Sequence, residues 1–472
     1  MMPTLTAEPE VKTTSTMKSI VSKQREFFNT GVTKSESFRR EQLTKLKAAF
    51  IKYEKELLAA LKTDLNKSEM EAYATEIGIS IADIDYNLKR LSKWMKPERV
   101  STPLFFLPGS SWLYKEPYGV SLIIGPWNYP FKNTVGPLIG AMSAGNTMII
   151  KPSELSPATS AVLNKLITET FDPRYIKVVE GGAAETTELI KERFDYILFT
   201  GGTEIGRIIY QAAAKHLTPV TLELGGKSPC IVDTDIDLDV TVKRIAWGKF
   251  VNAGQTCIAP DYVLINKKVK QQFIDKMKQT ITEFYGADPK ASPDFARIIS
   301  DRHFERVKKL IDGDVVAGGQ SDASQKYIAP TVIDNVTNDH KIMQEEIFGP
   351  IVPLMEYDTV DQAIAKINSG EKPLALYIFS RNKDFSERII NETSSGAVSV
   401  NEVMMHAGHP GLPFGGVGNS GTGAYNGKFG FDTFSHTKPA LKRPFMFDVK
   451  QKYAPYTPGN VSFIRFAINK LL

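Results

Sequence analysis

Cys257 has the side chain best suited to nucleophilic chemistry in this sequence. It lies in NAGQTCIAPDY, shortly after Gly254, and glycine permits a tight backbone turn. A cysteine placed after such a turn can lie beside backbone N–H groups, which favour the thiolate and lower the pKa of the thiol. Taken alone, Cys257 fits a buried structural cysteine better, which is how we interpret Cys230 in SPCIVD.

Glu223 and Asn128 could supply a base and a hydrogen-bond donor to such a nucleophile. Glu223 ends an apolar run in VTLELGG, where a carboxylate is costly unless it is paired, protonated or used in chemistry. A buried glutamate with a raised pKa suits a general base. Asn128 lies between two prolines in GPWNYPF, a rigid setting for an amide that binds an oxyanion. A solvent-facing glutamate and an ordinary turn asparagine are the alternatives.

The motif FTGGTEIG at 199–206 could bind the phosphates of a nucleotide. It follows the apolar run YILF, and the spacing from Gly201 through Gly202 and Thr203 to Gly206 resembles a phosphate-binding turn at a helix N-terminus. The motif matches neither a Walker A loop nor GxGxxG. By itself it is therefore a weak signal.

Two other loops could bind the remaining parts of a dinucleotide. In IIKPSEL, Lys151 and Glu154 follow an apolar run and could hydrogen-bond a ribose. In QEEIFGPI, Glu346 could bind a second ribose while Phe348 packs on a planar ring. Taken alone, the first loop fits a solvated turn better, and the second fits a loop with a core phenylalanine better.

Elements that place these residues together are visible in the apolar pattern. Short apolar runs alternate with helix-like segments such as 157–170 and 203–216. Non-alternating runs of this kind indicate βα units and a parallel sheet covered on both faces, which binds ligands at the carboxyl ends of its strands. The runs are at 120–124, 147–150, 176–179, 196–199 and 220–224.

The flanking segments predict helices before this sheet and a second α/β lobe after it. Apolar spacings of three and four predict helices over 40–62 and 72–95, and residues 111–124 indicate two strands separated by a Pro-Tyr-Gly turn. After Gly226 the alternation restarts. The second lobe is expected to contain helices at 237–252, 268–285 and 359–369 and strands at 262–265, 375–379 and 397–400.

Composition excludes several other classes of protein. The 472 residues exceed one hydrophobic core, and the net charge of 58 − 53 = +5 demands no nucleic acid. Two cysteines are too few for a secreted disulfide scaffold, so we expect a reducing, cytoplasmic compartment. The six histidines form no metal-binding pattern, so no metal is expected. The polar, threonine-rich N-terminus predicts a loose tail, and no apolar run reaches membrane-spanning length.

Seven motifs in this order resemble the aldehyde dehydrogenase superfamily. They extend from residue 126 to residue 421 with compatible spacing, and chance agreement of all seven is implausible. GQTCIAPDY, the short N-terminal region and the C-terminal YAPYTP segment resemble the class 3 branch, which includes the fatty aldehyde dehydrogenases. The matching segments are PWNYP, KPSE, FTGGTEIG, ELGGKSP, GQTC, EEIFGP and PFGGVGNSG.

The resemblance implies an α/β aldehyde dehydrogenase fold, with a Rossmann-like cofactor domain, an α/β catalytic domain and a small oligomerisation element that forms a homodimer. We therefore divide the chain as follows: 1–18, a flexible N-terminal tail; 19–110 and 121–224, the cofactor-binding domain; 225–412, the catalytic domain; 111–120 and 425–445, the oligomerisation element; 446–472, a C-terminal amphipathic tail.

The resemblance also assigns a role to each candidate residue. Cys257 matches the nucleophile, Glu223 the general base that activates water, and Asn128 the oxyanion donor together with the Cys257 backbone amide. The implied reaction oxidises an aldehyde to the acid through a thiohemiacetal and a thioester. The residues that match cofactor contacts are Trp127, Lys151, Glu154, Gly201, Gly202, Thr203, Gly206, Glu346 and Phe348.

NAD is the expected cofactor, with NADP also accepted. The carboxylate of Glu154 would repel the 2′-phosphate of NADP, while Lys151 could offset that repulsion. A CoA-acylating dehydrogenase would not need the base Glu223. A cysteine esterase would have no use for the cofactor motifs, and a binding protein on this fold would be expected to have lost Cys257 or Glu223.

Residues 460–472 predict an amphipathic helix preceded by basic residues. At about 1.5 Å per residue this helix is about 20 Å long, too short for the ~30 Å core of a bilayer. It could attach to the surface of a membrane or pack on the same dimer, over the substrate entrance. Either placement is compatible with an apolar substrate, a medium- or long-chain, aromatic or polyene aldehyde.

Overall fold

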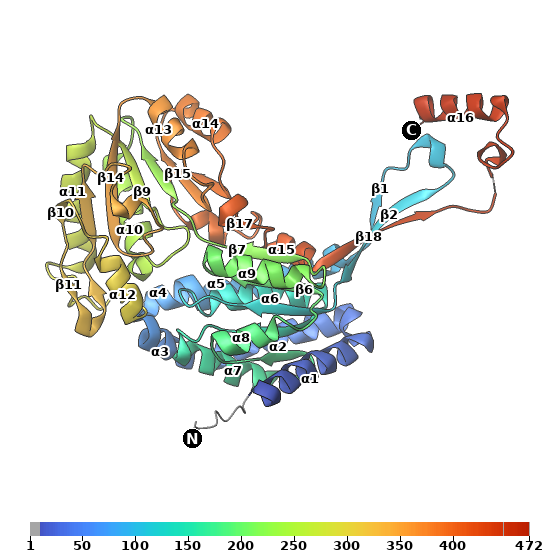
Figure 1. Cartoon of the computed structure of the whole chain (residues 1–472), viewed down its shortest axis with the longest axis horizontal. Coiled ribbons are helices and arrows are strands. Elements are labelled where there is room, and N and C mark those ends of the chain that lie inside the picture. Colours follow the sequence, from blue (N-terminus) through green and yellow to red (C-terminus); the bar gives the residue numbers. More distant parts are fainter. Residues whose placement is uncertain (1–9, 447, 472) are drawn as a thin grey trace, which may run out of the picture.

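Two open sheets covered by helices form the two lobes of the molecule, and a narrow arm projects from them (Figure 1). The structure is a computed structural model that describes residues 10–446 and 448–471. No helix in these ranges is long and apolar enough to cross a membrane.

The first lobe contains a sheet with the strand order β17-β7-β6-β3-β4-β5. All neighbours are parallel except β17, which is antiparallel to β7. The chain starts at the central strand β3, continues outward to β5 and returns to β6, so the strand succession reverses between β3 and β6. Open α/β sheets bind ligands at such a switch point. The strands are β3 (Val120–Ile124), β4 (Thr147–Lys151), β5 (Ile176–Val178), β6 (Tyr196–Thr200), β7 (Val220–Glu223) and β17 (Gly421–Thr422).

Helices cover both faces of this sheet, and its strands are almost wholly buried. The expected βα alternation is therefore confirmed, and the helix predicted over 157–170 has those bounds in the structure. The helices of this lobe are α1 (Glu10–Asn29), α2 (Glu36–Lys52), α3 (Glu54–Leu65), α4 (Glu69–Ala72), α5 (Gly78–Met95), α6 (Lys132–Ala144), α7 (Pro157–Thr170), α8 (Ala183–Leu189), α9 (Thr203–Ala214) and α15 (Gly427–Thr433).

The two long helices predicted before the sheet are both interrupted. The first is divided at Tyr53, which departs from helical geometry (φ −95°, ψ 6°), although the apolar stripe remains buried on both sides of the break. The second consists of α4 and α5 joined by a π-helical turn, η2 (Tyr73–Ile77). Apolar spacing alone did not reveal these breaks, because the buried stripe continues through them.

The N-terminal segment differs from the predicted loose tail. Helix α1 already begins at Glu10, so the prediction is wrong for residues 10–18, while residues 1–9 lie outside the described part. Met17 and Val21 are buried against the first lobe, and the Gln24 side chain donates to the Met148 carbonyl of β4 at 2.9 Å. One apolar stripe is enough to hold this otherwise polar helix against the first lobe.

The second lobe contains a sheet with the strand order β10-β13-β14-β9-β8-β15-β16, in which only β10 is antiparallel to its neighbour. This confirms the second α/β lobe. Its strands are β8 (Pro229–Val232), β9 (Tyr262–Asn266), β10 (Asp314–Ala317), β13 (Thr331–Asp334), β14 (Ile351–Tyr357), β15 (Ala375–Phe379) and β16 (Ala397–Val400), with a small hairpin of β11 (Ser321–Asp322) and β12 (Tyr327–Ile328). Its helices are α10 (Leu238–Phe250), α11 (Lys270–Tyr285), α12 (Asp301–Lys308), α13 (Val360–Asn368) and α14 (Lys383–Glu392).

The arm is an antiparallel sheet of β1 (Glu98–Val100), β2 (Ser110–Pro117) and β18 (Ser435–Lys442), and α16 (Pro458–Leu471) lies at its far end (Figure 1). The hairpin and the late strand expected to form one element therefore do pair. Two boundaries differ from the expected ones. Strand β1 belongs to the arm rather than to the cofactor domain, and α15 packs against α6 of the first lobe.

Candidate active site

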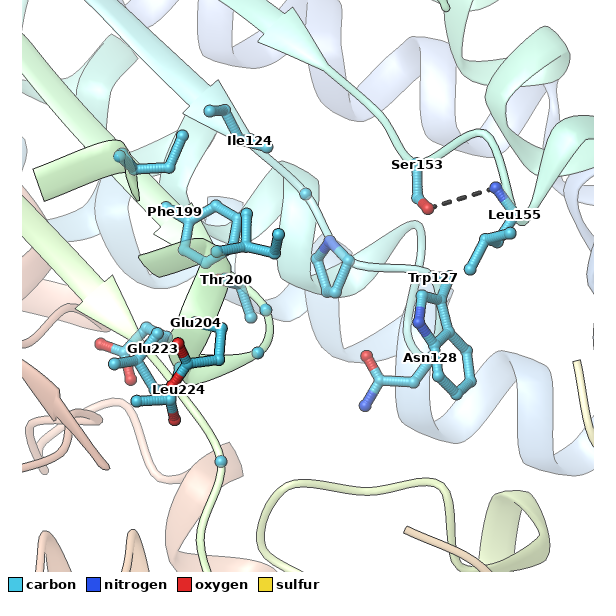
Figure 2. A pocket seen from close by; sticks show the side chains of 18 of the residues that line it. Ile124, Trp127, Asn128, Ser153, Leu155, Phe199, Thr200, Glu204, Glu223 and Leu224 are labelled. Atoms are coloured by element: carbon cyan, nitrogen blue, oxygen red, sulfur yellow. Dashed lines mark hydrogen bonds between the residues drawn. The ribbon is translucent and has the colours of Figure 1, made fainter. Parts of the chain in front are cut away.

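A cavity of about 810 Å³ lies between the two lobes, at the carboxyl ends of β3, β4, β6 and β7. Figure 2 shows Trp127 and Asn128 on one side of it and Glu223 and Leu224 on the other. All of the residues predicted to be catalytic or to bind the cofactor line this cavity, with the exception of Gly206.

Cys257 follows a tight turn, η4 (Val251–Gly254), as the sequence predicts. Asn252, Ala253 and Gly254 all have positive φ values, of 53°, 51° and 73°. A methyl group on Gly254 would come within 2.2 Å of the Gly349 carbonyl oxygen. The turn therefore depends on glycine both for its backbone conformation and for its close approach to the neighbouring loop.

The pKa of the Cys257 thiol is raised, whereas the sequence led us to expect a lowered pKa. Burial raises the pKa of the thiol, and the nearby Glu346 and Glu223 raise it further, while hydrogen bonds from the backbone N–H groups of Cys257 and Ile258 lower it less. The predicted amides are present, but desolvation of the thiolate outweighs them. Cys257 is partly exposed to the cavity, whereas Cys230 is fully buried on β8, so only Cys257 is placed for chemistry.

Glu223 ends β7 with its carboxylate buried, and its side chain reaches the cavity (Figure 2). Neither carboxylate oxygen has a hydrogen-bond partner among the described residues. Burial raises the pKa of this carboxyl well above its usual range. An unpartnered buried carboxyl with high proton affinity can accept a proton from a group that enters the cavity.

Asn128 follows β3, and its side-chain Nδ2 donates one hydrogen bond to the Gln255 carbonyl at 3.0 Å. This bond fixes the amide group next to the segment that carries Cys257. The amide has a second N–H, and Asn128 lines the cavity. The second N–H can therefore donate to an oxygen atom in the cavity.

Lys151 and Glu154 lie where β4 ends. The buried Lys151 ammonium donates to the Pro152 carbonyl at 2.7 Å and lies 4.0 Å from the Glu154 carboxylate, which is half exposed. Burial lowers the pKa of Lys151, and Glu154 opposes this effect. The loop thus presents one cation and one accessible carboxylate to hydroxyl groups of a ligand.

Gly201 and Gly202 form the turn between β6 and α9, Thr203 is the first residue of α9, and all three line the cavity. A methyl group on Gly202 would meet nothing within 4 Å, so the space above the start of α9 is open. Gly206 has another role, because its N–H bonds to Gly202 within the helix and a methyl group there would lie 2.6 Å from the Leu224 side chain. Gly206 therefore packs α9 closely on the sheet instead of lining the cavity.

Glu346 and Phe348 approach from the second lobe. The Glu346 carboxylate packs on Gly225, where a methyl group would lie 1.9 Å from Oε2, and burial raises the pKa of Glu346 to about 8. The Phe348 ring packs edge-on against Trp127, with centroids 5.2 Å apart. Both Glu346 and Phe348 thus line the cavity from the second lobe.

Sequence reasoning missed His303 and Arg306, both on α12. His303 packs on the Trp127 ring at 4.9 Å, and burial lowers its pKa to about 4, with help from Arg306 and Arg302. Arg306 donates to the carbonyls of Glu346 and Ile347, at 3.1 and 2.7 Å. The surrounding sequence contains no motif that could have revealed either residue.

These groups fit a dinucleotide cofactor. The cavity is large enough for a ligand of this class, and a helix N-terminus that opens onto free space can receive phosphate groups. Glu154 and Glu346, at separate edges, can accept hydrogen bonds from two ribose rings. The Trp127 ring lies on the same side of the cavity as Asn128 (Figure 2), so a planar ring of the ligand that packs on Trp127 would lie close to Asn128.

Comparison with known proteins identifies the same family that the sequence motifs resemble. The model of the aldehyde dehydrogenase family matches residues 4–440. The 4,4'-diaponeurosporen-aldehyde dehydrogenase of Staphylococcus aureus is 50% identical over 93% of this chain and 96% of that protein. Aldehyde dehydrogenase family 3 member A2 of Mus musculus is 48% identical over 96% and 94% of the two chains. The dimeric NADP-preferring aldehyde dehydrogenase of Canis lupus familiaris is 48% identical over 93% and 98%.

A solved structure agrees with these sequences. The substrate-bound state of Staphylococcus aureus AldH superposes with a TM-score of 0.94 at 48% identity, covering 96% of this chain and 99% of that one. The predicted fold and the resemblance to the fatty aldehyde dehydrogenase branch are confirmed. This chain therefore belongs to the aldehyde dehydrogenase family, and it oxidises aldehydes with NAD or NADP.

Proposed function

We propose that Cys257, Glu223 and Asn128 carry out the chemical steps, on an apolar aldehyde. The observation that carries this proposal is that a cysteine, an unpartnered buried carboxyl and an anchored amide donor line one cavity with the cofactor loops. The arrangement supports attack on a carbonyl group, stabilisation of the resulting oxyanion and hydrolysis of an acyl intermediate.

The Cys257 thiolate attacks the aldehyde carbon and forms a thiohemiacetal. The second N–H of Asn128 and the Cys257 backbone amide stabilise the oxygen that becomes negative, and a preorganised donor of this kind contributes about 3–4 kcal/mol. The bound nicotinamide supplies the acceptor for the hydride that leaves this carbon. Cys257 then holds a thioester, and Glu223 takes a proton from the water that hydrolyses it.

Lys151 and Glu154 would hold the adenosine ribose, Glu346 the nicotinamide ribose, and Gly201 to Thr203 the pyrophosphate. We propose NAD as the preferred cofactor, because the accessible Glu154 carboxylate would repel a 2′-phosphate. Lys151 offsets this repulsion only partly, since one of its hydrogen bonds is already made to Pro152. NADP would then bind more weakly rather than not at all.

The proposed substrates are medium- or long-chain, aromatic or polyene aldehydes. A related enzyme of 50% identity is named for the aldehyde of diaponeurosporene. The test is the absorbance of reduced nicotinamide with decanal and either cofactor, with Cys257→Ala as the blank. Absence of signal from folded protein with short, aromatic and long aldehydes would contradict the proposal.

Glu223→Gln separates the two halves of the reaction. We expect the first turnover to give a rapid burst of reduced cofactor and steady-state turnover to fall about 100-fold, within the range attributed to one general base. Equal loss of burst and turnover would instead assign Glu223 to activation of the thiol. Turnover that requires CoA would favour an acylating dehydrogenase, and ester cleavage without any aldehyde oxidation would favour a cysteine esterase.

A homodimer built on the arm is the proposed assembly. Strand β18 is at the edge of the arm sheet and therefore has free backbone groups that a second chain can pair with. A relative of this chain is described as dimeric. Sedimentation of the whole enzyme should give twice the chain mass, and Thr437→Pro in β18 should shift it toward the monomer while Thr393→Pro, outside the arm, should not. A monomeric wild type would contradict this assembly.

We also propose that the enzyme is cytoplasmic and that α16 contacts an anionic membrane surface. Both cysteines are free thiols. Helix α16 packs on the arm through Ala467, while four large apolar side chains remain about half exposed: Val461, Phe463, Phe466 and Ile468. The preceding segment is rich in lysine and arginine. Exposed apolar groups next to basic ones suit the interface of a membrane that contains anionic lipid.

Flotation with vesicles tests this contact. The whole enzyme should bind phosphatidylcholine vesicles that contain phosphatidylserine, and Phe463→Ser/Phe466→Ser should abolish the binding without changing turnover of propanal. A different outcome is that neither the wild type nor the variant binds the vesicles and that the variant changes the stability of the dimer. This outcome would show that α16 packs on the partner subunit and does not contact a membrane.

A further inference from the structure

Lys67 and Glu76 form an ion pair that has no exposed side-chain surface. Lys67 lies in the turn between α3 and α4, and Glu76 lies in the π-helical turn η2. Buried pairs are rarely explained by stability alone, because the cost of desolvation offsets their attraction. π-helical turns are also frequent at functional sites. Neither residue lines the cavity between the lobes.

The pair holds the backbone that follows the Asn128 side chain at two points. The Lys67 ammonium also donates to the Asn128 carbonyl at 3.0 Å and lies 4.0 Å from the centre of the Tyr129 ring. The second oxygen of Glu76 accepts the N–H groups of Phe131 at 2.9 Å and Lys132 at 3.3 Å. The loop that carries Asn128 is thus fixed both at its carbonyl and at the start of α6.

The same carbonyl is connected to the turn before Cys257. The Asn252 side-chain amide donates to the Asn128 carbonyl at 2.8 Å and to the Gln255 carbonyl at 3.2 Å, and the Asn252 backbone N–H bonds to the Glu71 carboxylate at 2.9 Å. The Asn128 side chain closes this network on Gln255. Segment 67–76 therefore contacts both loops that supply the proposed oxyanion donors.

We propose that Lys67 and Glu76 are positioning residues that hold the Asn128 amide at the oxyanion site. The inference rests on the proposed role of Asn128 and adds the means by which its geometry is kept. Because both side chains are shielded from the cavity, they act only through the loop that they bind. A displacement of about 1 Å at a catalytic group can cost about 100-fold in rate.

The test uses Lys67→Met/Glu76→Gln, which removes both charges together and leaves no unpaired ion in the interior. With saturating decanal and NAD, we expect the rate of the hydride burst to fall about 10- to 100-fold, while the NADH dissociation constant, from fluorescence titration, stays within about 3-fold. A matched control is Lys47→Met/Asp85→Asn, which removes another ion pair of the N-terminal helices, at 2.7 Å, and should leave the burst unchanged.

Combination with Asn128→Ala distinguishes positioning from general damage. If the pair acts through Asn128, the double change should lower the burst by less than about 3-fold in an enzyme that already lacks this amide, because the interaction is then gone. If Asn128→Ala slows the burst but the double change lowers the burst rate as much in this background as in the wild type, the positioning role is overturned while the role of Asn128 stands. A burst at full rate in Asn128→Ala overturns the role of Asn128 and, with it, this inference.

Glu76→Asp provides a second variant if the double change does not fold, because it keeps both charges of the buried pair. Its side chain is one methylene shorter, so it weakens the hydrogen bonds to Lys67 and to the Phe131 N–H. The expected fall in burst rate is about 3- to 10-fold, the factor that corresponds to loss of a weakened hydrogen bond. An unchanged burst rate would contradict the proposal.

Discussion

At the scale of residues, burial sets the protonation of the two groups proposed to be catalytic. The cavity disfavours charge, so both the Cys257 thiol and the Glu223 carboxyl have raised pKa values. A cysteine that keeps its proton is a weak nucleophile and must lose that proton as it attacks. A carboxyl with high proton affinity is a stronger base once it is ionised. The same desolvation therefore disfavours formation of the Cys257 thiolate and raises the proton affinity of the Glu223 carboxylate.

Alkylation of Cys257 by iodoacetamide should report this thiol directly. Because the raised pKa leaves little thiolate at neutral pH, the rate in the enzyme without cofactor should keep rising from pH 7 to pH 9.5. Loss of thiol is followed by mass spectrometry, and Cys257→Ala should remain unlabelled because Cys230 is buried. A rate that levels off below pH 8 would mean that the backbone amides dominate after all.

The pH dependence of turnover should reveal Glu223. The group can act as a base only when ionised, and its raised pKa moves ionisation upward, so the rate of thioester hydrolysis should increase through neutral pH into the alkaline range. Stopped-flow measurement after the hydride burst isolates this step. In Glu223→Gln the slope should disappear, and a slope that persists unchanged would assign the titration to another group.

At the scale of elements, the ends of strands and the turns after them carry the site. Loops from β3, β4, β6 and β7 meet because parallel strands present their carboxyl ends at one edge. The loop with Glu346 and Phe348 reaches this edge from the other lobe and is held there by Arg306. The fit between the two lobes is close at Gly225, where the Glu346 carboxylate occupies the space of a side chain.

Gly225→Ala should therefore displace Glu346 and weaken cofactor binding. We expect the KM for NAD to rise about 10-fold, the equivalent of about 1.4 kcal/mol, because the proposed contact of the Glu346 carboxyl with a ribose would be misplaced. Initial rates at varied NAD measure the effect. Gly370→Ala, where a methyl group would meet only the Ile367 carbonyl at 3.7 Å, should leave this KM unchanged. An unaltered KM in Gly225→Ala would show that Glu346 does not bind the cofactor.

At the scale of the whole molecule, the arm separates the C-terminal helix from the catalytic lobes (Figure 1). Within one chain, α16 packs on η3 (Leu104–Phe106) and η9 (Lys450–Lys452). It does not line the cavity that contains Cys257. Covering a substrate entrance is therefore possible only between the two subunits of a dimer.

Removal of residues 457–472 should change kcat/KM for propanal by less than about 3-fold, a difference of about 0.7 kcal/mol. Helix α16 packs at the tip of the arm, so its removal should leave the catalytic lobes intact. Steady-state kinetics with propanal and decanal measure the effect on the same preparation. A fall of more than 10-fold for decanal alone would place α16 over the entrance of the partner's site.

The sequence by itself determined the βα order and most of the site, because these depend on local features. Apolar runs define buried strands, and the residues after Ile124, Lys151, Thr200 and Glu223 are brought to one edge by any parallel arrangement of those strands. Cys257 was identifiable from its motif. Eleven of the twelve residues named from the motifs and the family resemblance line the cavity, since only Gly206 does not.

Only the tertiary structure decided the contacts between distant segments and the consequences of burial. His303 and Arg306 reach the cavity from the second lobe. Lys67 contacts Asn128, which lies 61 positions later in the sequence. No local sequence pattern predicts these contacts. The Cys257 pKa depends on the balance between amides and desolvation, which is fixed by how the lobes close over the site. Local periodicity specifies elements, whereas packing between them sets distances, exposure and charge.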